Sequence, residues 1–320
     1  MTKTVLAFGE TLWDLFPTGA KLGGAPFNFV YRAACLGERG IMVSRLGRDA
    51  LGRKAFEQIV SLGMETGQVQ WDARHPTGTV DVTFDAGHNP HYVINPDVAY
   101  DYIRPTKELL AAAAGADCIC FGTLAQRCEV SRRALRRLLD AAGGALKLLD
   151  INLRPNCYTQ ETVRESLQEA DILKLNETEA VQLAELLQIP GAASCGGARP
   201  PAEIAEDLVE KCSLSCCVVT LGDRGALAVA ADGRKAYVPG FRVALVDPCG
   251  SGDAFTAGFL HRYFEGARLS ECCRYGNALG AIVAAQRGAT EPFGAAGVQK
   301  FLESGVERTG APDMESITFP

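Results

Sequence analysis

Short apolar runs alternate with amphipathic stretches along most of the 320 residues. The apolar runs have the length of buried strands and lie at residues 5–8, 41–44, 118–121, 146–151, 172–175 and 217–221. Between them, apolar residues recur at helical spacing, as they do over 131–142, 177–187 and 204–211. Apolar strands separated by helices favour βαβ units. The pattern therefore predicts an α/β fold with a mostly parallel sheet that is covered on both faces.

Two segments depart from this pattern. Residues 11–24 follow the first predicted strand without a helix, and within 77–95 the apolar Val80, Val82 and Phe84 alternate with polar neighbours. Such alternation is typical of strands with one solvated face, so we expect these segments to pair into a small sheet that forms a lid. Residues 191–201 are rich in glycine, alanine and proline and predict an exposed connection.

The composition excludes several classes of protein. With 38 acidic and 32 basic side chains, the net charge of −6 argues against a broad nucleic-acid surface. The chain has no apolar run long enough to span a membrane, and Glu10 interrupts the first apolar run, so we expect no signal peptide and a cytoplasmic protein. The twelve cysteines include no CxxC motif, and we interpret them as small buried hydrophobes.

The segment 247–260, DPCGSGDAFTAGFL, carries the strongest chemical signal. Gly250 and Gly252 flank Ser251, and Asp253 then opens an amphipathic helix. Glycines and a helix N-terminus together make an anion site, beside which an aspartate is suited to act as a base. The alternative is structural: Ser251 caps the helix, and Asp253 occupies the first turn because acids favour that end. The segment alone leaves both interpretations open.

A second unusual segment is GGAPFN at 23–28. Asn28 falls in the first turns of a predicted helix, where asparagine is unfavourable, so it is a candidate for a buried polar ligand. The alternative is a glycine turn followed by a capping amide. The chain contains neither a Walker A sequence nor a dinucleotide fingerprint that could explain the glycines.

Together, GGAPFN and DPCGSGD resemble the two signatures of the ribokinase-like (PfkB) carbohydrate kinase family. The resemblance covers about residues 5–302, and further segments agree with it in order: GETLWD at 9–14, GTLAQR at 122–127, DINLRP at 150–155, KLNETE at 174–179, TLGDRG at 220–225 and GNALGAIVAAQRGA at 276–289. It implies one ribokinase-like three-layer α/β/α domain over 1–310, with lid strands from about 11–24 and 77–104. Residues 311–320 would form a tail.

Within the family, the segments GTLAQR and DINLRP are most similar to those of bacterial fructokinases. The resemblance implies an ATP-dependent kinase that transfers the γ-phosphate to a primary hydroxyl of a small sugar, with fructose as the first choice. The alternatives are 2-keto-3-deoxygluconate kinase, ribokinase, a nucleoside kinase or a non-catalytic sugar or nucleotide sensor. The expected partners are sugar and ATP, without nucleic acid or membrane. Pairing of exposed lid edges suggests a homodimer.

Residue roles carry over by position. The resemblance implies that Asp253 is the catalytic base and that the backbone of Gly250, Ser251 and Gly252 forms an anion hole. It assigns sugar contacts to Asp14, Gly24 and Asn28, and Arg154 joins the substrate site because Asp150, Asn152 and Arg154 alternate onto one face at the end of a strand. The implied nucleotide contacts are Asn176, Thr220, Gly222, Gly225 and Asn277.

Two ions follow from the same resemblance. Glu179, three residues after Asn176, matches a motif that acts on Mg²⁺ through water, although the same spacing is typical of a helix capping box. Many relatives hold a monovalent cation such as K⁺ beside the base loop, through groups equivalent to those of Asp247, Cys249 and Gly288. The role of Arg127 stays open between a surface charge and a substrate contact.

Overall fold

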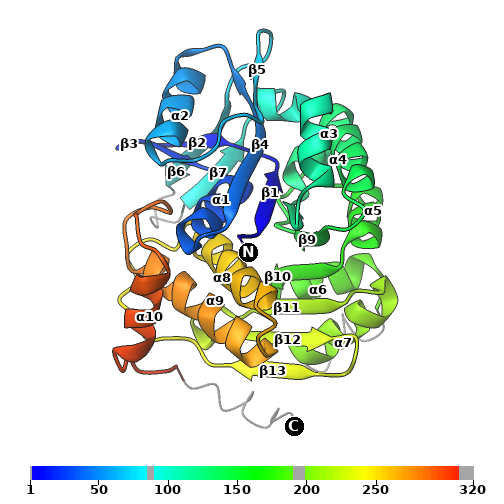
Figure 1. The fold of residues 1–320 in the computed structure, drawn as a ribbon, viewed down its shortest axis with the longest axis vertical. Coiled ribbons are helices and arrows are strands. Elements are labelled where there is room, and N and C mark those ends of the chain that lie inside the picture. Colours follow the sequence, from blue (N-terminus) through cyan, green and yellow to red (C-terminus); the bar gives the residue numbers. More distant parts are fainter. Residues whose placement is uncertain (1, 85–89, 190–198, 310–320) are drawn as a thin grey trace.

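The structure, a computed structural model, describes residues 2–84, 90–189 and 199–309 (Figure 1). The predicted connection at 191–201 therefore lies almost wholly outside the described residues, as does the tail at 311–320. Within the described part, the central sheet has the strand order β13-β12-β11-β10-β9-β8-β1-β4-β5. Its strands are β1 (Thr4–Phe8), β4 (Arg39–Gly47), β5 (Val69–Asp72), β8 (Cys118–Phe121), β9 (Leu146–Asp150), β10 (Ile172–Asn176), β11 (Cys216–Thr220), β12 (Ala226–Ala230) and β13 (Lys235–Val238).

The sheet is parallel from β11 to β5, and only β12 and β13 pair antiparallel, at one edge. Each of the six strands expected from the sequence is present. The predicted α/β fold with a mostly parallel sheet is therefore confirmed.

Helices cover both faces of the sheet and make the three layers (Figure 1). One face is covered by α1 (Ala25–Leu36), α2 (Ala50–Ser61), α8 (Ser251–Phe264) and α9 (Leu269–Ala284), with α10 (Ala295–Glu303) packed on α9. The other face is covered by α3 (Lys107–Ala114), α4 (Glu129–Ala141), α5 (Gln160–Glu169), α6 (Glu177–Leu186) and α7 (Pro201–Cys212). Three 3₁₀ turns, η1 (Ala99–Tyr102), η2 (Leu124–Arg127) and η3 (Gly222–Arg224), connect elements.

Strand alternation explains why the runs are apolar throughout. In β1, Leu6 and Phe8 enter the core beneath α3–α7, whereas Val5 and Ala7 enter the core beneath α1 and α8. Both faces of the strand are buried, so both sets must be apolar. Cys118 and Cys120 share the second face. The described cysteines are free, and most of them are buried, with Cys249 exposed.

A smaller sheet of order β3-β2-β6-β7 forms the predicted lid. Its strands are β2 (Leu12–Phe16), β3 (Gly19–Gly23), β6 (Gly78–Phe84) and β7 (Pro90–Ile94), and β2 pairs parallel with β6. Leu12, Val80 and Val82 pack into the main core. On the edge strand β7, Tyr92 and Val93 are 60% and 56% exposed. Association of two chains through this edge stays a prediction.

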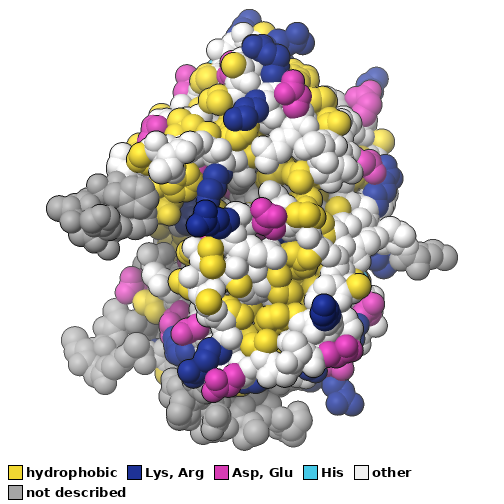
Figure 2. Space-filling model, turned by 90° about the vertical axis from the view of Figure 1, so that its left-hand side faces the viewer, with side chains coloured by type: hydrophobic (Ala, Val, Ile, Leu, Met, Phe, Trp, Pro, Cys, Tyr) yellow, Lys and Arg dark blue, Asp and Glu magenta, His cyan; other side chains and the backbone are white. Residues whose placement is uncertain are grey.

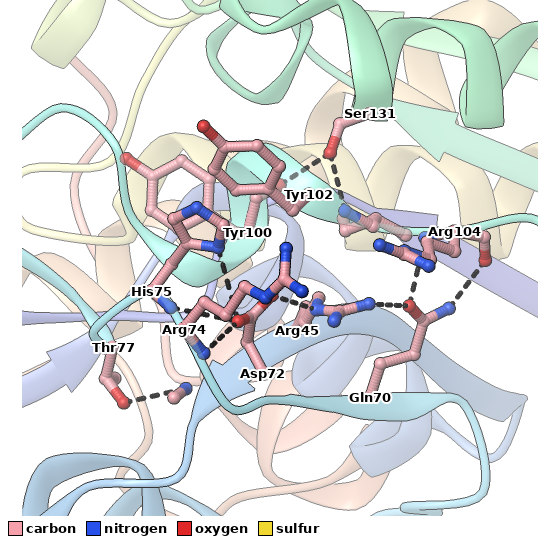
Figure 3. Close-up of polar contacts among 12 residues, drawn as sticks. Arg45, Gln70, Asp72, Arg74, His75, Thr77, Tyr100, Tyr102, Arg104 and Ser131 are labelled. Carbon is pink, nitrogen blue, oxygen red and sulfur yellow. Dashed lines mark hydrogen bonds and ion pairs between the residues drawn. The ribbon is translucent and has the colours of Figure 1, made fainter.

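A polar cluster fixes the chain where it passes from β5 towards the lid (Figure 3). Asp72, the last residue of β5, accepts Nε of Arg45 at 2.7 Å and the amides of Arg74 and His75 at 2.7 and 2.9 Å. The ring of His75 stacks on Tyr102 with 3.6 Å between centroids. Burial alone would raise the pKa of Asp72, but the amides of His75 and Arg74 hold it well below its usual range.

Arg127 anchors the other end of the lid. Its guanidinium binds both carboxylate oxygens of Asp101 at 2.8 Å and the carbonyl oxygen of Asn95, just after β7, also at 2.8 Å. It also donates to the hydroxyl of Tyr100 at 3.0 Å. These contacts give Arg127 a structural role that the sequence left open.

None of the helices in the described ranges is long and apolar enough to cross a membrane.

Candidate active site

The candidate residues gather at the edge of the large sheet where its parallel strands end. Asp150 ends β9, Asn176 ends β10 and Thr220 ends β11, and Asn176 lies opposite Thr220 in the strand register. Ligands of open α/β sheets bind outside the carboxyl ends of the strands. The fold therefore brings these residues, which are far apart in sequence, to the place where a ligand would bind.

The start of α8 has the geometry of an anion site. Gly250 caps the helix with a φ of 78°, and a Cβ at this position would lie 2.3 Å from the Cβ of Ala289, so only glycine fits. First-turn N–H groups have no acceptor within their own helix, and the helix dipole adds a partial positive charge. Ser251 turns its amide and hydroxyl back to the Pro248 carbonyl oxygen, at 3.2 and 2.8 Å. The predicted amides that remain for an anion are those of Gly250 and Gly252.

Asp253 lies in this first turn, and Asn28 holds its carboxylate. Nδ2 of Asn28 donates to Oδ2 of Asp253 at 2.8 Å. Asn28 is only 3% exposed, and its Oδ1 is a buried acceptor without a hydrogen-bond partner in the described part of the chain. Burial, followed by the negative charge of Asp150, raises the pKa of Asp253 to about 7. A carboxyl with a pKa near neutrality is well matched to accept a proton during a reaction.

Asp14 lies on the lid strand β2, next to the glycine pair that precedes α1. A Cβ at Gly23 would lie 3.2 Å from Oδ2 of Asp14, and a Cβ at Gly24 would lie 2.4 Å from the carbonyl oxygen of Glu10. At both glycines the backbone thus lies too close to Asp14 or Glu10 to admit a side chain without a shift. Burial raises the pKa of Asp14 to about 6, and the charge of Arg154 opposes the rise.

Glu10 is a second buried carboxyl at this place. It is 4% exposed, its Oε1 accepts the amide of Ala25 at 3.2 Å, and burial raises its pKa to about 7. The positive charge of Arg154 acts on Glu10, Asp14 and Asp253 alike. The three carboxyls therefore surround one common region, and Arg154 borders it.

The predicted nucleotide residues lie in neighbouring loops. Gly222 and Gly225 have φ values of 63° and 99°, and a Cβ at Gly225 would lie 2.1 Å from the carbonyl oxygen of Val238. Asn277, on α9, donates through Nδ2 to that same carbonyl oxygen at 3.0 Å. These glycines are thus required by the turn, and Asn277 fixes the end of β13.

Residues 8–295 match the pfkB family carbohydrate kinases, which covers almost the whole chain. The chain belongs to this family. It is an ATP-dependent carbohydrate kinase. Among curated proteins, Fructokinase-1 of Oryza sativa subsp. japonica is 30% identical over an alignment of 321 residues that covers 90% of this chain and 94% of that protein.

Solved structures agree with the fold of the kinase. A fructokinase with bound ATP from Xylella fastidiosa has a TM-score of 0.81 at 23% identity and covers 95% of this chain and 99% of its own. The 2-dehydro-3-deoxygluconokinase of Thermotoga maritima has a TM-score of 0.80 at 19% identity, over 94% and 98% of the two chains. Both confirm the ribokinase-like fold. They do not separate one sugar from the other.

Glu179 of the kinase fits an indirect contact with Mg²⁺. Oδ1 of Asn176 accepts the amide of Glu179, and Oε2 of Glu179 accepts the amide of Asn176, both at 2.9 Å. Oε1 of Glu179 accepts the amide of Leu153 at 3.0 Å. The capping box expected as the alternative is therefore present. With both oxygens used and only 6% of Glu179 exposed, a contact through water fits the site better than direct coordination.

Asp247 is held by the lid. Nζ of Lys21, on β3, lies 2.9 Å from its Oδ2, and the amide of Cys249 donates to its Oδ1 at 3.1 Å. Both carboxylate oxygens thus already have a partner. Gly288 has a φ of 90° in the loop after α9. Each carboxylate oxygen of Asp247 keeps a further lone pair that could face a cation, and we derive no step through a monovalent cation.

Arg32, on α1, holds the loop that packs against the start of α8. Its guanidinium is 1% exposed and donates to the carbonyl oxygens of Ala289, at 2.5 Å, and Glu291, at 2.7 Å. Ala289 is the residue that packs on Gly250. The helix that presents Asn28 to Asp253 therefore also fixes the loop against which α8 begins.

Glu10, Arg32 and Lys174 are residues that the sequence analysis did not assign to the site. Each lies in or beside an apolar segment: Glu10 follows β1, Arg32 lies among buried residues of α1, and Lys174 lies within β10. A buried charge is costly unless it is paired. The interruption of an apolar run by a charge was the signal that could have identified them.

An open groove of about 320 Å³ lies along α10. Figure 2 views the molecule from this side, where hydrophobic side chains form a band across the lower half of the face. The residues that line the groove are Ile282, Phe293, Gly297, Lys300, Phe301 and Ser304. None of the predicted site residues is among them, so the groove is separate from the candidate active site.

Proposed function

We propose that this kinase transfers the γ-phosphate of ATP to a primary hydroxyl of fructose. The observation that carries the proposal is the pair formed by Asn28 and Asp253. A buried amide oxygen without a partner lies beside a carboxyl whose pKa is about 7. A sugar hydroxyl is both donor and acceptor, so a polyol would satisfy the amide and offer its proton to the carboxyl. The fructokinases among the relatives support fructose as the sugar.

Sugar binding would use the residues between the lid and the main sheet. Asp14 accepts hydroxyl protons from the lid side, and Asn28 donates and accepts from the side of α1. A side chain at position 23 would crowd the carboxylate of Asp14, and one at position 24 would collide with the backbone of Glu10. A sugar enclosed between these residues loses its contact with water, which strengthens the electrostatic interactions within the site.

In the chemical step, Asp253 takes the proton of the primary hydroxyl while that oxygen forms a bond to the γ-phosphorus. The bond from the γ-phosphorus to the bridging oxygen of ATP breaks, and ADP leaves. The amides of Gly250 and Gly252 donate to the oxygens of the transferring group. Mg²⁺ bound with ATP would neutralise part of the phosphate charge, with Glu179 and Asn176 acting on it through water.

The charges of the site favour a neutral sugar. Glu10, Asp14 and Asp253 border the same region, and Arg154 is the cation whose charge opposes the rise in the pKa of all three. A sugar acid such as 2-keto-3-deoxygluconate would bring a further negative charge to these carboxyls. It would be repelled unless Arg154, with Lys21 and Lys174, compensated it. This argument ranks fructose above the sugar acid.

A coupled ADP-release assay with fructose, ribose, 2-keto-3-deoxygluconate and adenosine tests the proposal. We expect the highest kcat/KM with fructose, and loss of turnover for every substrate in Asp253→Asn. A higher kcat/KM with any of the other three would overturn the fructose assignment. If no acceptor releases ADP while calorimetry shows ATP binding, the sensor alternative would replace the kinase.

A further inference from the structure

Lys174 is a buried cation beneath the start of α8. It lies in β10, directly opposite Asp150 of β9 in the strand register, and is 8% exposed. Its Nζ lies 3.1 Å from Oδ1 of Asp150. The other carboxylate oxygen, Oδ2, is 2.8 Å from the hydroxyl of Thr256, one turn into α8. Sheet and helix are thus joined by one buried charged contact.

The ammonium also lies close to the anion site itself. A Cβ built on Gly252 would be 3.3 Å from Nζ of Lys174. A side chain there would be in tight contact with the ammonium and would push it by a few tenths of an ångström. The residue that follows Gly252 is Asp253.

We propose that Lys174 is a positioning residue for phosphoryl transfer: held by Asp150 beside Gly252, its ammonium supplies the fixed positive charge that keeps Asp253 able to act as a base and supports the neighbouring amides. The proposal rests on the role of Asp253 proposed above. The hydrogen bond of Lys174 goes to Asp150 and not to Asp253. Lys174 therefore acts on Asp253 through its electrostatic field and by holding α8 in place. Arg154 also carries positive charge near Asp253, but it is exposed and therefore more strongly screened.

Several groups contribute to the electrostatic environment of Asp253. Their charges determine in which direction the pKa of Asp253 moves when Lys174 is removed. Asp150 makes protonation of Asp253 easier, whereas Lys174, Arg154 and the amide of Asn28 oppose it. Glu10 interacts with Asp253 as a second acid. Burial keeps the nearby thiol of Cys120 protonated, because it raises the pKa of that thiol. Removing Lys174 would therefore leave Asp150 uncompensated beside the base.

The test is the pH dependence of kcat with saturating fructose and ATP. In Lys174→Met we expect the acidic limb of the profile to move up by about one pH unit or more, and kcat at the optimum to fall by roughly 10- to 100-fold. In Lys174→Met/Asp150→Asn both charges are gone, so the limb should return towards the wild-type position while kcat stays low. Thr256→Val removes the contact to the helix without changing a charge and should leave the limb in place.

Each outcome of this test either supports the role of Lys174 or overturns it. An unmoved acidic limb in folded Lys174→Met, with the same Tm change as Thr256→Val, would reduce Lys174 to a structural ion pair and overturn the proposal. If Lys174→Met does not fold, Lys174→Gln takes its place, and its acidic limb must likewise move to higher pH. A wild-type protein that phosphorylates none of the four acceptors would instead overturn the proposed function.

Discussion

Asn28 and Asp253 lie 225 positions apart in the sequence, and Nδ2 of the first donates to Oδ2 of the second at 2.8 Å. This bond connects the first turn of α1 with the first turn of α8. It leaves the other polar atom of Asn28, a buried Oδ1, without a partner among the described residues. A buried acceptor without a partner costs about 1–3 kcal/mol. A bound hydroxyl group would remove that cost, so the pair accounts for both sugar binding and placement of the base.

Replacing Asn28 with aspartate tests this pair. A second carboxylate next to Asp253 would raise the pKa of Asp253 further and remove a donor to the sugar. We expect Asn28→Asp to raise the KM for fructose and to shift the acidic limb of kcat/KM to higher pH. The exposed Asn156→Asp is the matched control and should behave as wild type. An unchanged KM in Asn28→Asp would remove Asn28 from the sugar site.

Asp253→Asn removes the proposed base while keeping nearly the same shape. We expect kcat to fall by roughly 10²- to 10⁴-fold, whereas the Kd for fructose, measured by calorimetry, should change little. Asp232→Asn, at an exposed turn, serves as the control with normal kcat. Retention of most activity in Asp253→Asn would contradict its assignment as base.

The same variant makes a prediction about stability. The pKa of Asp253 is about 7 in the folded protein against an ordinary value of 3.8, so the folded state holds the proton more tightly than the unfolded state. Its stabilising contribution is complete below about pH 4 and is lost as the pH rises through 7. Asparagine cannot ionise. Thermal unfolding should therefore show a higher Tm for Asp253→Asn than for wild type at pH 8, and the gap should close towards pH 4.

Arg32→Met tests the support behind the anion site. It would leave the carbonyl oxygens of Ala289 and Glu291 without their donors, at a cost of roughly 1–3 kcal/mol for the buried one at Ala289. We expect a lower midpoint of urea unfolding and weaker ATP binding, because Ala289 packs on Gly250. The exposed Arg287→Met should change stability by no more than about 0.5 kcal/mol. Equal effects of the two variants would refute this role of Arg32.

The low pKa of Asp72, in the polar cluster between β5 and the lid, predicts how the stability of the protein changes in acid. Its pKa is held below the usual range, so its contribution to stability is present above its ordinary value of 3.8 and is lost as the pH falls below it. We expect Asp72→Asn to lower the Tm at pH 7, with a difference from wild type that narrows below about pH 4. A difference that is the same at both pH values would mean that the charge of Asp72 contributes nothing.

The sequence by itself determined the layers, the lid and the residues at the start of α8. These depend on local causes, namely the period of apolar residues, the strict demand for glycine at a helix start and the alternation in the lid strands. Asp253, Gly250 and Asn28 could therefore be named before any contact was known. The pattern could not show that Ser251 turns its amide back to Pro248, because that depends on the path of a single turn.

Only the tertiary structure decided which charges meet. Lys174 and Asp150 face each other because β9 and β10 are neighbours in register, and Arg32 reaches Ala289 because α1 packs beside α8. Lys21 reaches Asp247 because the lid lies over the loop before α8, so the carboxylate for which the resemblance implies a K⁺ contact also has a lysine partner. These pairings join residues that are between 24 and 257 positions apart in the sequence. Their energies depend on distance and burial, which one-dimensional periodicity does not contain.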